Sequence, residues 1–453
     1  MTRMSGRVSV GAAVVAVAVG GLLAPSAGAA TNPNGATNPN GVANLAQELH
    51  SGTLSASHGV KKICGPNGRC MGEVLTTAPG SNTPLSTTAP VGYGPAELAA
   101  AFHLPAGNVG QHGTIAIIDA GAYPTLEADL ATYRATYGLP LCDIQNDCLK
   151  IADYHGGGPL APATDDTGKI EEEEVAEETS LDVDMASAAC PGCAIVEVQV
   201  PLADAFPGSA AAEDTATADF ATAVTTAIGM GANSVSISYG YDVDSADSTG
   251  LTAKQLDDPG VAIVASSGDS GFAGNFPSWP AALDTVTAAG GISLYPNSSG
   301  KGYAQTAWSG AGAGCAATLP PAIGQPKSVA ANCGGHRAYA DVSAVADPST
   351  GVAVFDTWAP SSGAPADWQF GGGTSASSPY IAGLYARGGK LSTVHGPNTV
   401  YSSARKNFTD VALGQVEPAG FCAEFSAKAP VCVSGAGWDG PTGLGTPNGL
   451  GAF

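Results

Sequence analysis

A serine between a pair of glycines and a helical pattern is the residue of this chain best suited to act as a nucleophile. Gly372 and Gly373 allow a tight turn, and Pro379 suits an early helical position, so Ser375 is predicted to lie at a helix N-terminus. Unpaired amides and the positive end of the helix dipole favour negative charge there. Ser375 could therefore attack a carbonyl carbon while its own amide binds the oxyanion. An ordinary serine N-cap is the alternative.

A nucleophilic serine needs a base, and an acidic segment offers one. Glu178 and Asp182 stand four residues apart, so in a helix they share one face and one of them gains proton affinity. Such a glutamate could accept the serine proton while the aspartate orients it and shares protons. The preceding acids at 171–174 are predicted to form a solvated face. Apolar residues interleaved with Asp182 indicate that the chain turns into the core at that point.

A third candidate is Asp269, which follows an apolar run in the segment 265–271. In open α/β sheets, sites are built at the carboxyl ends of strands. A protonated Asp269 could donate a hydrogen bond to an oxyanion, which requires acid pH or a raised pKa. The alternative is an aspartate that closes a Gly-Asp turn.

A Ser-His-Asp arrangement is the competing interpretation. Residues 117–121 resemble the strand end that carries the aspartate of subtilisin-like proteases, so Asp119 and His155 could serve as partners of Ser375. However, the His-Gly-Thr-His helix start of those enzymes is absent from the sequence, and His112 precedes the Asp119 segment instead of following it. These departures weaken the histidine-based interpretation.

Three motifs in this order resemble the sedolisin family of serine-carboxyl peptidases: residues 178–182, 266–271 and 373–379. The resemblance covers about residues 89–453 and implies a subtilisin-like fold in which a glutamate replaces the histidine. By this resemblance Ser375 is the nucleophile and Glu178 is the general base and then the general acid. Asp182 would be the supporting carboxyl and Asp269 the acid of the oxyanion hole.

The C-terminal segments 408–411, 435–439 and 441–447 resemble the calcium site of the same family. The resemblance implies one structural Ca²⁺ ion with five ligands: the carboxylates of Asp410 and Asp439 and the carbonyls of Val411, Gly435 and Gly437. Such hard oxygen ligands are those that calcium requires.

The strands and helices that would position these residues are predicted from apolar runs that alternate with helical patterns along the chain. Apolar runs predict strands at 114–118, 194–200, 234–238, 261–265 and 285–288, and helical patterns occur at 95–102, 125–137, 173–189 and 214–230. This alternation predicts an α/β fold with a mostly parallel central sheet flanked by helices. We expect a single large catalytic domain over residues 89–453.

The N-terminus predicts export. Two arginines, an apolar run at 8–23 and small residues before position 30 are typical of a signal peptide over residues 1–30; a retained membrane anchor is the alternative. Ten cysteines in an exported chain indicate five disulfides. If neighbours pair, the loops are 64–70, 142–148, 190–193, 315–333 and 422–432, although other pairings have the same count. A redox or metal role is the alternative for Cys190 and Cys193.

Residues 31–88 are predicted to be a low-complexity leader or short propeptide without a core, because they are rich in Ser, Thr, Gly and Pro. Sedolisins usually carry a long folded prodomain. The mode of activation is therefore open: unaided folding, a short leader that suffices, or reduced activity.

Charge limits the partners. The chain has 39 acidic and 17 basic residues and a net charge of -22, the wrong sign for nucleic acid or anionic membranes. We therefore expect a secreted, extracellular monomer that takes protein or peptide substrates, uses an acyl-enzyme on Ser375 and is more active and more stable at pH 4 than at pH 7. The alternatives are a histidine-dependent subtilisin-like peptidase and a catalytically weak binding protein on the same fold.

Overall fold

The computed structural model of the chain describes residues 39–51, 54–106, 113–242, 250–273, 278–297, 302–363, 367–416 and 429–453. The predicted signal peptide, His112 and Cys422 lie outside the described residues. All the described residues belong to one folded unit.

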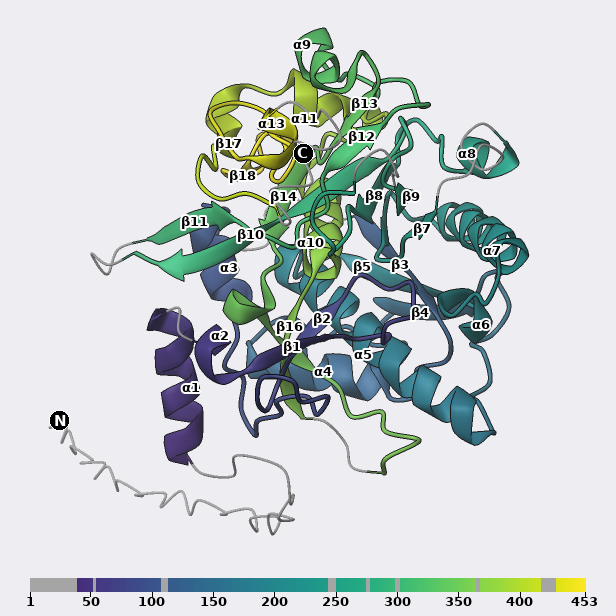
Figure 1. Ribbon diagram of the computed structural model, residues 1–453. Coiled ribbons are helices and arrows are strands. Elements are labelled where there is room, and N and C mark those ends of the chain that lie inside the picture. The colour runs from purple at the N-terminus through teal and green to yellow at the C-terminus, as the bar shows by residue number, and fades with distance from the viewer. Residues whose placement is uncertain are drawn as a thin grey trace, which may run out of the picture. The chain divides into compact units, whose positions relative to one another are not determined.

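A mostly parallel sheet organises this unit (Figure 1). Its strands are β3 (Thr114–Ala120), β4 (Leu149–Asp153), β5 (Ala194–Val200), β6 (Ser234–Ile237), β8 (Ala262–Ser266), β10 (Thr287–Pro296), β11 (Tyr303–Ala307) and β14 (Val342–Val345). They are ordered β11-β10-β8-β6-β3-β5-β4, and β14 also pairs with β10. Of the pairings between these described strands, only that of β10 with β11 is antiparallel. The predicted sheet is therefore confirmed.

The five apolar runs predicted as strands form β3, β5, β6, β8 and β10. Strands buried on both faces give continuous apolar runs, which explains why these were recognisable. β10 extends to Pro296, well beyond the predicted end. The prediction ended too early because Gly290 and Gly291 interrupt the apolar pattern of the strand. Close packing of other segments leaves room only for glycine at both positions. A Cβ atom on Gly290 would lie 2.6 Å from the Pro441 carbonyl oxygen, and one on Gly291 would lie 2.5 Å from the Ala346 Cβ atom.

The four predicted helices are also present: α3 (Pro95–Ala101), α4 (Leu126–Thr136), α5 (Asp166–Ala189) and α7 (Ala210–Gly229). α5 begins earlier than expected because the Asp165 carboxylate caps it, accepting a hydrogen bond of 2.9 Å from the Gly168 amide. The acidic run at 171–174 therefore lies inside the helix. The expectation that this run is a solvated face is wrong for Glu172, which is buried and accepts a hydrogen bond from the Ala163 amide.

Helix α10 (Thr374–Gly388) packs along α5 and against the sheet. A hydrogen bond of 2.9 Å links Ser378 of α10 to Ser236 of β6. Gly383 permits the close approach of the two helices, since a Cβ atom there would lie 2.6 Å from that of Ala189. The side chains on α5 and α10 are thereby held at fixed relative positions.

A second sheet includes residues of the expected leader. Its order is β1 (Gly59–Lys62), β2 (Glu73–Thr76), β16 (Trp368–Gly372) and β15 (Val352–Phe355). The described part of residues 31–88 also buries several apolar side chains: Leu45, Leu49, Leu54, Ile63, Val74, Leu75 and Leu85. The expectation that this stretch has no core is therefore wrong, because a few apolar residues among many small polar ones suffice to pair and pack against the larger unit. Its removal as a propeptide stays a prediction.

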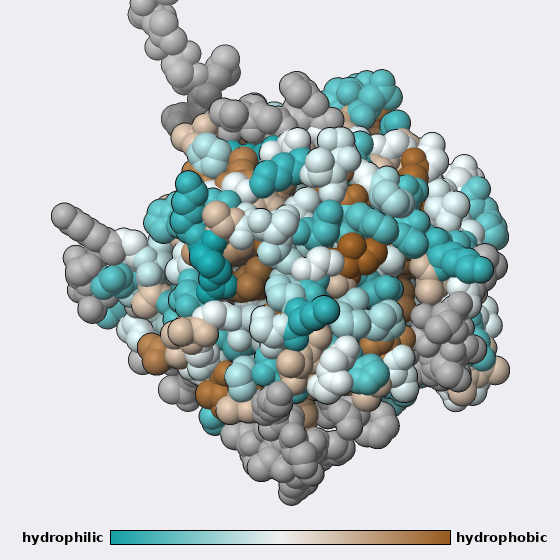
Figure 2. All heavy atoms as spheres, turned by 90° about the horizontal axis from the view of Figure 1, so that it is seen from above, coloured by the Kyte–Doolittle hydropathy of each residue, from teal (hydrophilic) through white to brown (hydrophobic). Residues whose placement is uncertain are grey.

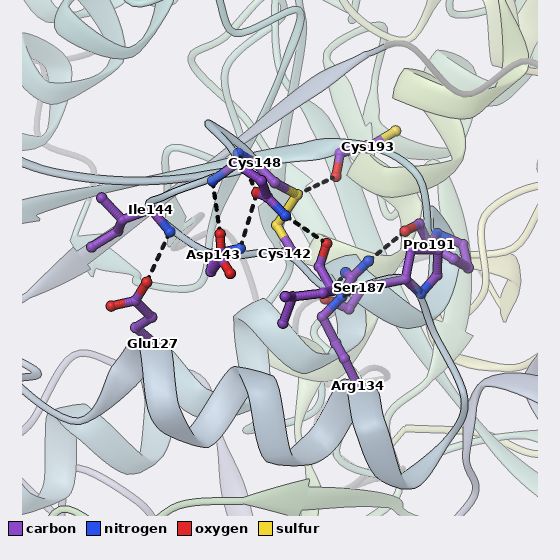
Figure 3. Close-up of a disulfide and its surroundings, with 12 residues drawn as sticks. Glu127, Arg134, Cys142, Asp143, Ile144, Cys148, Ser187, Pro191 and Cys193 are labelled. Atoms are coloured by element: carbon purple, nitrogen blue, oxygen red, sulfur yellow. Dashed lines mark hydrogen bonds between the residues drawn. A yellow bond between two sulfur atoms is a disulfide. The ribbon is translucent and has the colours of Figure 1, made fainter.

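Four of the five expected disulfides are present, joining residues 64–70, 142–148, 190–193 and 315–333. A disulfide leaves neither sulfur free as a thiolate ligand, so the metal alternative for Cys190 and Cys193 is not supported, while nothing in the structure tests the redox alternative. The fifth expected pair includes Cys422, outside the described residues. Figure 3 shows the Cys142–Cys148 loop beside Arg134 of α4, which donates hydrogen bonds to the Ser187 hydroxyl and the Pro191 carbonyl. These contacts hold the C-terminal end of α5.

Shorter elements complete the described chain. The helices are α1 (Pro39–Ser51), α2 (Leu54–Ser57), α6 (Leu202–Ala205), α8 (Leu251–Gln255), α9 (Lys327–Ala330), α11 (Asn398–Ser402) and α13 (Ala429–Cys432). The strands are β7 (Tyr241–Asp242), β9 (Ser278–Trp279), β12 (Gly314–Ala316), β13 (Arg337–Tyr339), β17 (Phe408–Thr409) and β18 (Thr446–Pro447). No helix in the described stretches has the length and apolar character needed to cross a bilayer. On the face drawn in Figure 2, apolar residues form small groups separated by polar ones.

Candidate active site

The candidate nucleophile lies where strand β16 passes into helix α10. Gly373 joins them with a φ of 81°, a left-handed conformation that glycine adopts without strain. Ser375 is the second residue of α10 and is fully buried. The predicted position of Ser375 at a helix N-terminus is therefore confirmed.

Glu178 on α5 faces this serine. The Ser375 hydroxyl donates a short hydrogen bond to Glu178 Oε1 and also lies 3.5 Å from the Ser238 carbonyl oxygen. Asp182, one turn further along α5, accepts a hydrogen bond of 2.8 Å from the Ser238 hydroxyl. Both carboxyl groups are completely buried, and each has a second oxygen that accepts no hydrogen bond from the described residues. The spacing of four residues thus places both side chains at one site, as expected.

Burial controls the protonation of this pair. It raises the pKa of Glu178 well above its usual range; the Ser375 hydrogen bond opposes the shift, and the charges of Asp119 and Asp269 add to it. Burial likewise raises the pKa of Asp182, and the charges of Asp119 and Glu178 increase the effect. The pair therefore retains protons at a pH where exposed carboxylates are ionised, and it titrates as a unit.

Asp269 follows the carboxyl end of β8 and contacts Thr374, the residue before Ser375. Its Oδ1 atom accepts hydrogen bonds of 2.7 Å from both the amide and the hydroxyl of Thr374. Its Oδ2 atom is buried and accepts no hydrogen bond from the described chain. Burial raises the pKa of Asp269 to about 7, although the hydrogen bonds from Thr374 and the charge of Lys62 oppose the shift. Below that pH a protonated Oδ2 can donate a hydrogen bond.

Asp119 joins the same group of carboxyl groups. It is fully buried on β3, and burial raises its pKa to about 7. The sequence suggested Asp119 only as a partner of His155. The structure instead brings it near Glu178 and Asp182, whose pKa values it helps to raise. His155 is exposed, and its ring stacks on Tyr154 at a centroid distance of 4.0 Å. The described side chain that accepts a hydrogen bond from the Ser375 hydroxyl is that of Glu178.

Glu73 is a site residue that the sequence did not indicate. Burial raises its pKa to about 8, and the charge of Asp269 adds to this shift while Lys62 opposes it. Glu73 and Asp269 line a cavity of about 500 Å³ together with Asp347. Glu73 is one acid in a segment expected to lack a core, so no sequence motif pointed to it.

A larger cavity of about 820 Å³ opens beside Asp269. Its lining includes Gly240, Asp242 and Ser270 from the larger unit and Lys62 and Met71 from the N-terminal segment. The cavity is large enough for amino-acid side chains of a bound peptide.

The residues expected to bind calcium lie on two turns near the C-terminus. Asp410 accepts hydrogen bonds of 3.1 and 3.2 Å from the Gly437 amide and one of 2.8 Å from Arg405. Asp439 is buried and accepts a hydrogen bond of 3.0 Å from the Gly435 amide. Burial raises the pKa of Asp439 to about 6, hydrogen bonds oppose the shift, and the charge of Asp410 adds to it. A cation would relieve the repulsion between the Asp410 and Asp439 carboxylates, and oxygen donors of this kind fit calcium. Among the described residues, no three acidic, histidine or cysteine side chains converge on one point.

Comparison with known proteins shows that the chain is similar to a curated protein and to a solved structure. The chain is 30% identical over 393 residues to kumamolisin of Bacillus sp. (strain MN-32), an alignment that covers 80% of this chain and 63% of that protein. Pseudomonas sedolisin, a serine-carboxyl proteinase solved with two molecules of pseudo-iodotyrostatin, superposes with a TM-score of 0.60 at 22% identity, over 80% of this chain and 96% of that one. No protein-family model matches the chain. The structural match confirms the predicted subtilisin-like α/β fold.

Proposed function

Because this chain belongs to the sedolisin family, we propose that it is a serine-carboxyl peptidase that cleaves peptide bonds through an acyl-enzyme on Ser375. The observation that carries the proposal is the hydrogen bond from the Ser375 hydroxyl to Glu178 within a buried group of carboxyls. The chain spans 63% of the length of kumamolisin. The activity of that whole protein is therefore not carried over, and the proposal depends on the geometry of the residues of this chain.

In acylation, the Ser375 oxygen attacks the peptide carbonyl carbon while its proton passes to Glu178. The oxyanion that forms accepts hydrogen bonds from the Ser375 amide and from the protonated Asp269 carboxyl. Collapse of the intermediate breaks the C–N bond, and Glu178 delivers its proton to the departing amine. The product is an ester between Ser375 and the acyl part of the substrate.

In deacylation, Glu178 takes a proton from a water molecule that attacks the ester carbon, and the Ser375 oxygen regains a proton as it leaves. Asp182 and Asp119 contribute by sharing protons with Glu178, since the charge of Asp119 raises the pKa values of Glu178 and Asp182 and that of Glu178 raises the pKa of Asp182. Glu178 thus alternates between base and acid without a histidine.

Acid operation follows from the role of Asp269. An ionised Asp269 would repel the oxyanion, whereas a protonated one stabilises it. Because its pKa is raised to about 7, the protonated fraction declines as pH rises through neutrality. We therefore expect maximal hydrolysis on the acid side and falling hydrolysis at pH 7 and above.

We further propose export of the protein and one structural Ca²⁺ ion. The disulfides favour an oxidising compartment. Five groups would hold the ion: the carboxylates of Asp410 and Asp439 and the carbonyls of Val411, Gly435 and Gly437. When bound, the ion would neutralise the two carboxylates and link their turns.

Hydrolysis of a denatured protein near pH 4, compared between the wild-type chain and Ser375→Ala, tests the proposed peptidase. Loss of hydrolysis in the variant is expected. Undiminished hydrolysis by Ser375→Ala would overturn the assignment, and absence of hydrolysis by the wild-type chain at every acid pH would favour a binding protein on the same fold.

A further inference from the structure

Residues 69–71 of the N-terminal segment pair with residues 238–240 beside the candidate active site. The Met71 amide donates a hydrogen bond of 2.8 Å to the Ser238 carbonyl, and the Gly240 amide donates one of 2.9 Å to the Arg69 carbonyl. Cys70 and Tyr239 form an antiparallel bridge between these two bonds. Extended peptides bind to protein strands by backbone pairing of this kind. The segment therefore shows how a peptide can bind to residues 238–240.

The Met71 carbonyl sets the register of this pairing relative to the nucleophile. Its oxygen accepts a hydrogen bond of 3.0 Å from the Ser375 amide, one of the groups assigned to the oxyanion. A Cβ atom on Gly373 would overlap the same oxygen and lie 2.5 Å from Asp269 Oδ2, so both oxygens border one small volume. Met71 thus occupies the position of the residue that carries the carbonyl of a scissile bond. Arg69 occupies the third position before such a bond.

The backbone of Arg69 is held from two directions. Its carbonyl accepts the hydrogen bond from Gly240, and its amide donates one of 2.9 Å to the Ala205 carbonyl at the end of helix α6. The Tyr241 hydroxyl donates a hydrogen bond of 2.8 Å to the Asp204 carbonyl, which connects α6 to the segment that contains Gly240. A peptide residue bound at this position is therefore held in a fixed orientation.

Glu213 receives the side chain of Arg69. The Arg69 guanidinium donates a hydrogen bond to Glu213 Oε1, and the two groups form an ion pair. The exposed fractions of the two side chains are 30% for Arg69 and 16% for Glu213, so water and salt screen the pair less than they screen an open surface pair. Glu213 lies in the first turn of helix α7, where unpaired amides favour a negative charge. A carboxylate thus faces the side chain at the third position before the scissile bond.

Charge in the lining of the larger cavity has the same polarity. The part of the chain after residue 88 contributes acids to the described lining, and these are Glu171, Glu174, Asp242 and Asp269. The lysine and arginine in that described lining both belong to the N-terminal segment, as Lys62 and Arg69. Opposite charges on a cleft and its occupant favour association and determine which partner is accepted. The cleft therefore favours basic peptides over acidic ones.

Two of these acids are neutral at the pH where hydrolysis is expected. Burial raises the pKa values of Glu174 and Asp269 to about 7, so both carry protons at acid pH. Selection of a cation under those conditions depends on an acid that contacts the cation directly. In the described chain, the acid that forms an ion pair with Arg69 is Glu213.

We propose that Glu213 is a specificity residue that selects a basic side chain at the third position before the scissile bond. The inference rests on the proposed peptidase activity and extends it to the class of peptide that is cleaved. A peptide that pairs with residues 238–240 in the same register places an arginine at that position against Glu213, as Arg69 is placed in this structure. Glutamine there keeps the length but loses the charge, and glutamate brings two like charges together.

Competition between peptides tests the assignment. Three peptides share the core Xaa-Ala-Met-Ala, with methionine in the place of Met71 and arginine, glutamine or glutamate as Xaa. They are mixed with the full-length chain at pH 5, above the ordinary glutamate pKa of about 4.3. Ratios of kcat/KM from one mixture do not depend on how much of the cleft is occupied by the chain's own segment. Mass spectrometry should show cleavage after methionine, with arginine preferred over glutamine about three- to fivefold and glutamate cleaved most slowly.

Substitutions at Glu213 separate recognition from a purely structural role. Glu213→Gln should abolish the preference for arginine over glutamine, and Glu213→Arg should reverse the order so that the glutamate peptide is cleaved faster than the arginine peptide. Asp214→Asn, an exposed change at the next position, should keep the wild-type order. A loss of folding would slow all three peptides alike and would not reverse their order.

Hydrolysis of a denatured protein is measured in the same samples. Where the wild-type chain hydrolyses that protein, equal cleavage of the three peptides, cleavage in another register or cleavage of none of them overturns the inference and leaves the peptidase intact. A preference for arginine that survives Glu213→Gln also overturns it, because Glu213 would then bind only the chain's own segment. Absence of hydrolysis of both the denatured protein and the peptides overturns both proposals.

Discussion

Ser375 and Glu178 form a direct hydrogen bond at a point where neither side chain is exposed to solvent. They come from helices α10 and α5, whose packing fixes the distance between them. The proposed base is thus in contact with the proposed nucleophile without an intervening histidine. The arrangement makes separate predictions for the base, the oxyanion acid and the surrounding carboxyls.

Glu178→Gln should lower kcat/KM at pH 4 by about 10²- to 10⁴-fold, because the amide cannot accept the Ser375 proton. Glu177→Gln is the matched control, since it removes a carboxyl from the neighbouring buried position without removing the base. Its kcat/KM should change less than about threefold. Peptide hydrolysis at fixed pH measures both. Activity that survives Glu178→Gln but is lost in His155→Ala would instead support the histidine-dependent alternative.

Asp269 should be replaceable in part by a neutral donor. Asp269→Ala removes the oxyanion donor and should cost about 10²- to 10³-fold in kcat. Asp269→Asn retains N–H groups whose ability to donate does not depend on pH. We expect Asn to lose less activity than Ala and to keep a larger share of its pH 4 activity at pH 7 than the wild-type chain does. Identical pH profiles for Asn and wild type would show that titration of Asp269 does not set the alkaline limb.

The sequence predicted the central fold well because its strands are buried on both faces and form continuous apolar runs. The catalytic candidates were also recognisable, since Ser375, Glu178 and Asp269 each occur in a local motif. Glu73 and Met71 were not. Their importance arises from contacts with residues more than a hundred positions away, in a segment whose composition indicated no core. Asp119 was identified as chemically relevant but associated with His155, because residues 117–121 resemble the strand end that carries the aspartate of subtilisin-like proteases. The sequence did not show that Asp119 is buried and His155 exposed.

The buried ion pair of Arg337 and Asp341 should be a stability determinant. Its two hydrogen bonds are 2.6 and 2.7 Å long, and neither side chain is exposed. Asp341→Asn leaves an uncompensated buried cation and should lower the free energy of unfolding by about 3–5 kcal/mol. Asp257→Asn, which breaks the exposed pair with His395, should cost at most about 1 kcal/mol. Urea unfolding at one pH compares them, and equal effects would contradict the assigned role of burial.

Calcium should raise the thermal stability of the chain. An ion present at about 100 times its Kd adds roughly 2.7 kcal/mol to the free energy of unfolding. A chelator should therefore lower Tm, and Asp439→Asn should remove that difference. Asp214→Asn, at an exposed position away from the two turns, should keep it. A wild-type Tm that is unaffected by chelation would argue against the proposed ion.

Stability should increase as pH falls from 8 to 4. Burial raises the pKa of Glu197 to about 8 and those of Asp119 and Asp269 to about 7. Between an unfolded pKa near 4 and these folded values, the folded chain retains protons that the unfolded chain releases. Stability is therefore greatest below the unfolded pKa and declines as pH rises, by about 1.4 kcal/mol for each pKa unit of difference at a given group.

Glu197→Gln isolates this effect from catalysis, because Glu197 lies on β5 and its described side-chain hydrogen bonds come from Gln199. The variant loses one group that titrates, so the slope of unfolding free energy against pH should be shallower than in the wild-type chain between pH 4 and pH 8. Asp214→Asn, which removes an exposed charge, should preserve the slope. The net charge of -22 acts in the same direction, since its self-repulsion weakens as carboxylates gain protons. A stability maximum at neutral pH would contradict both contributions.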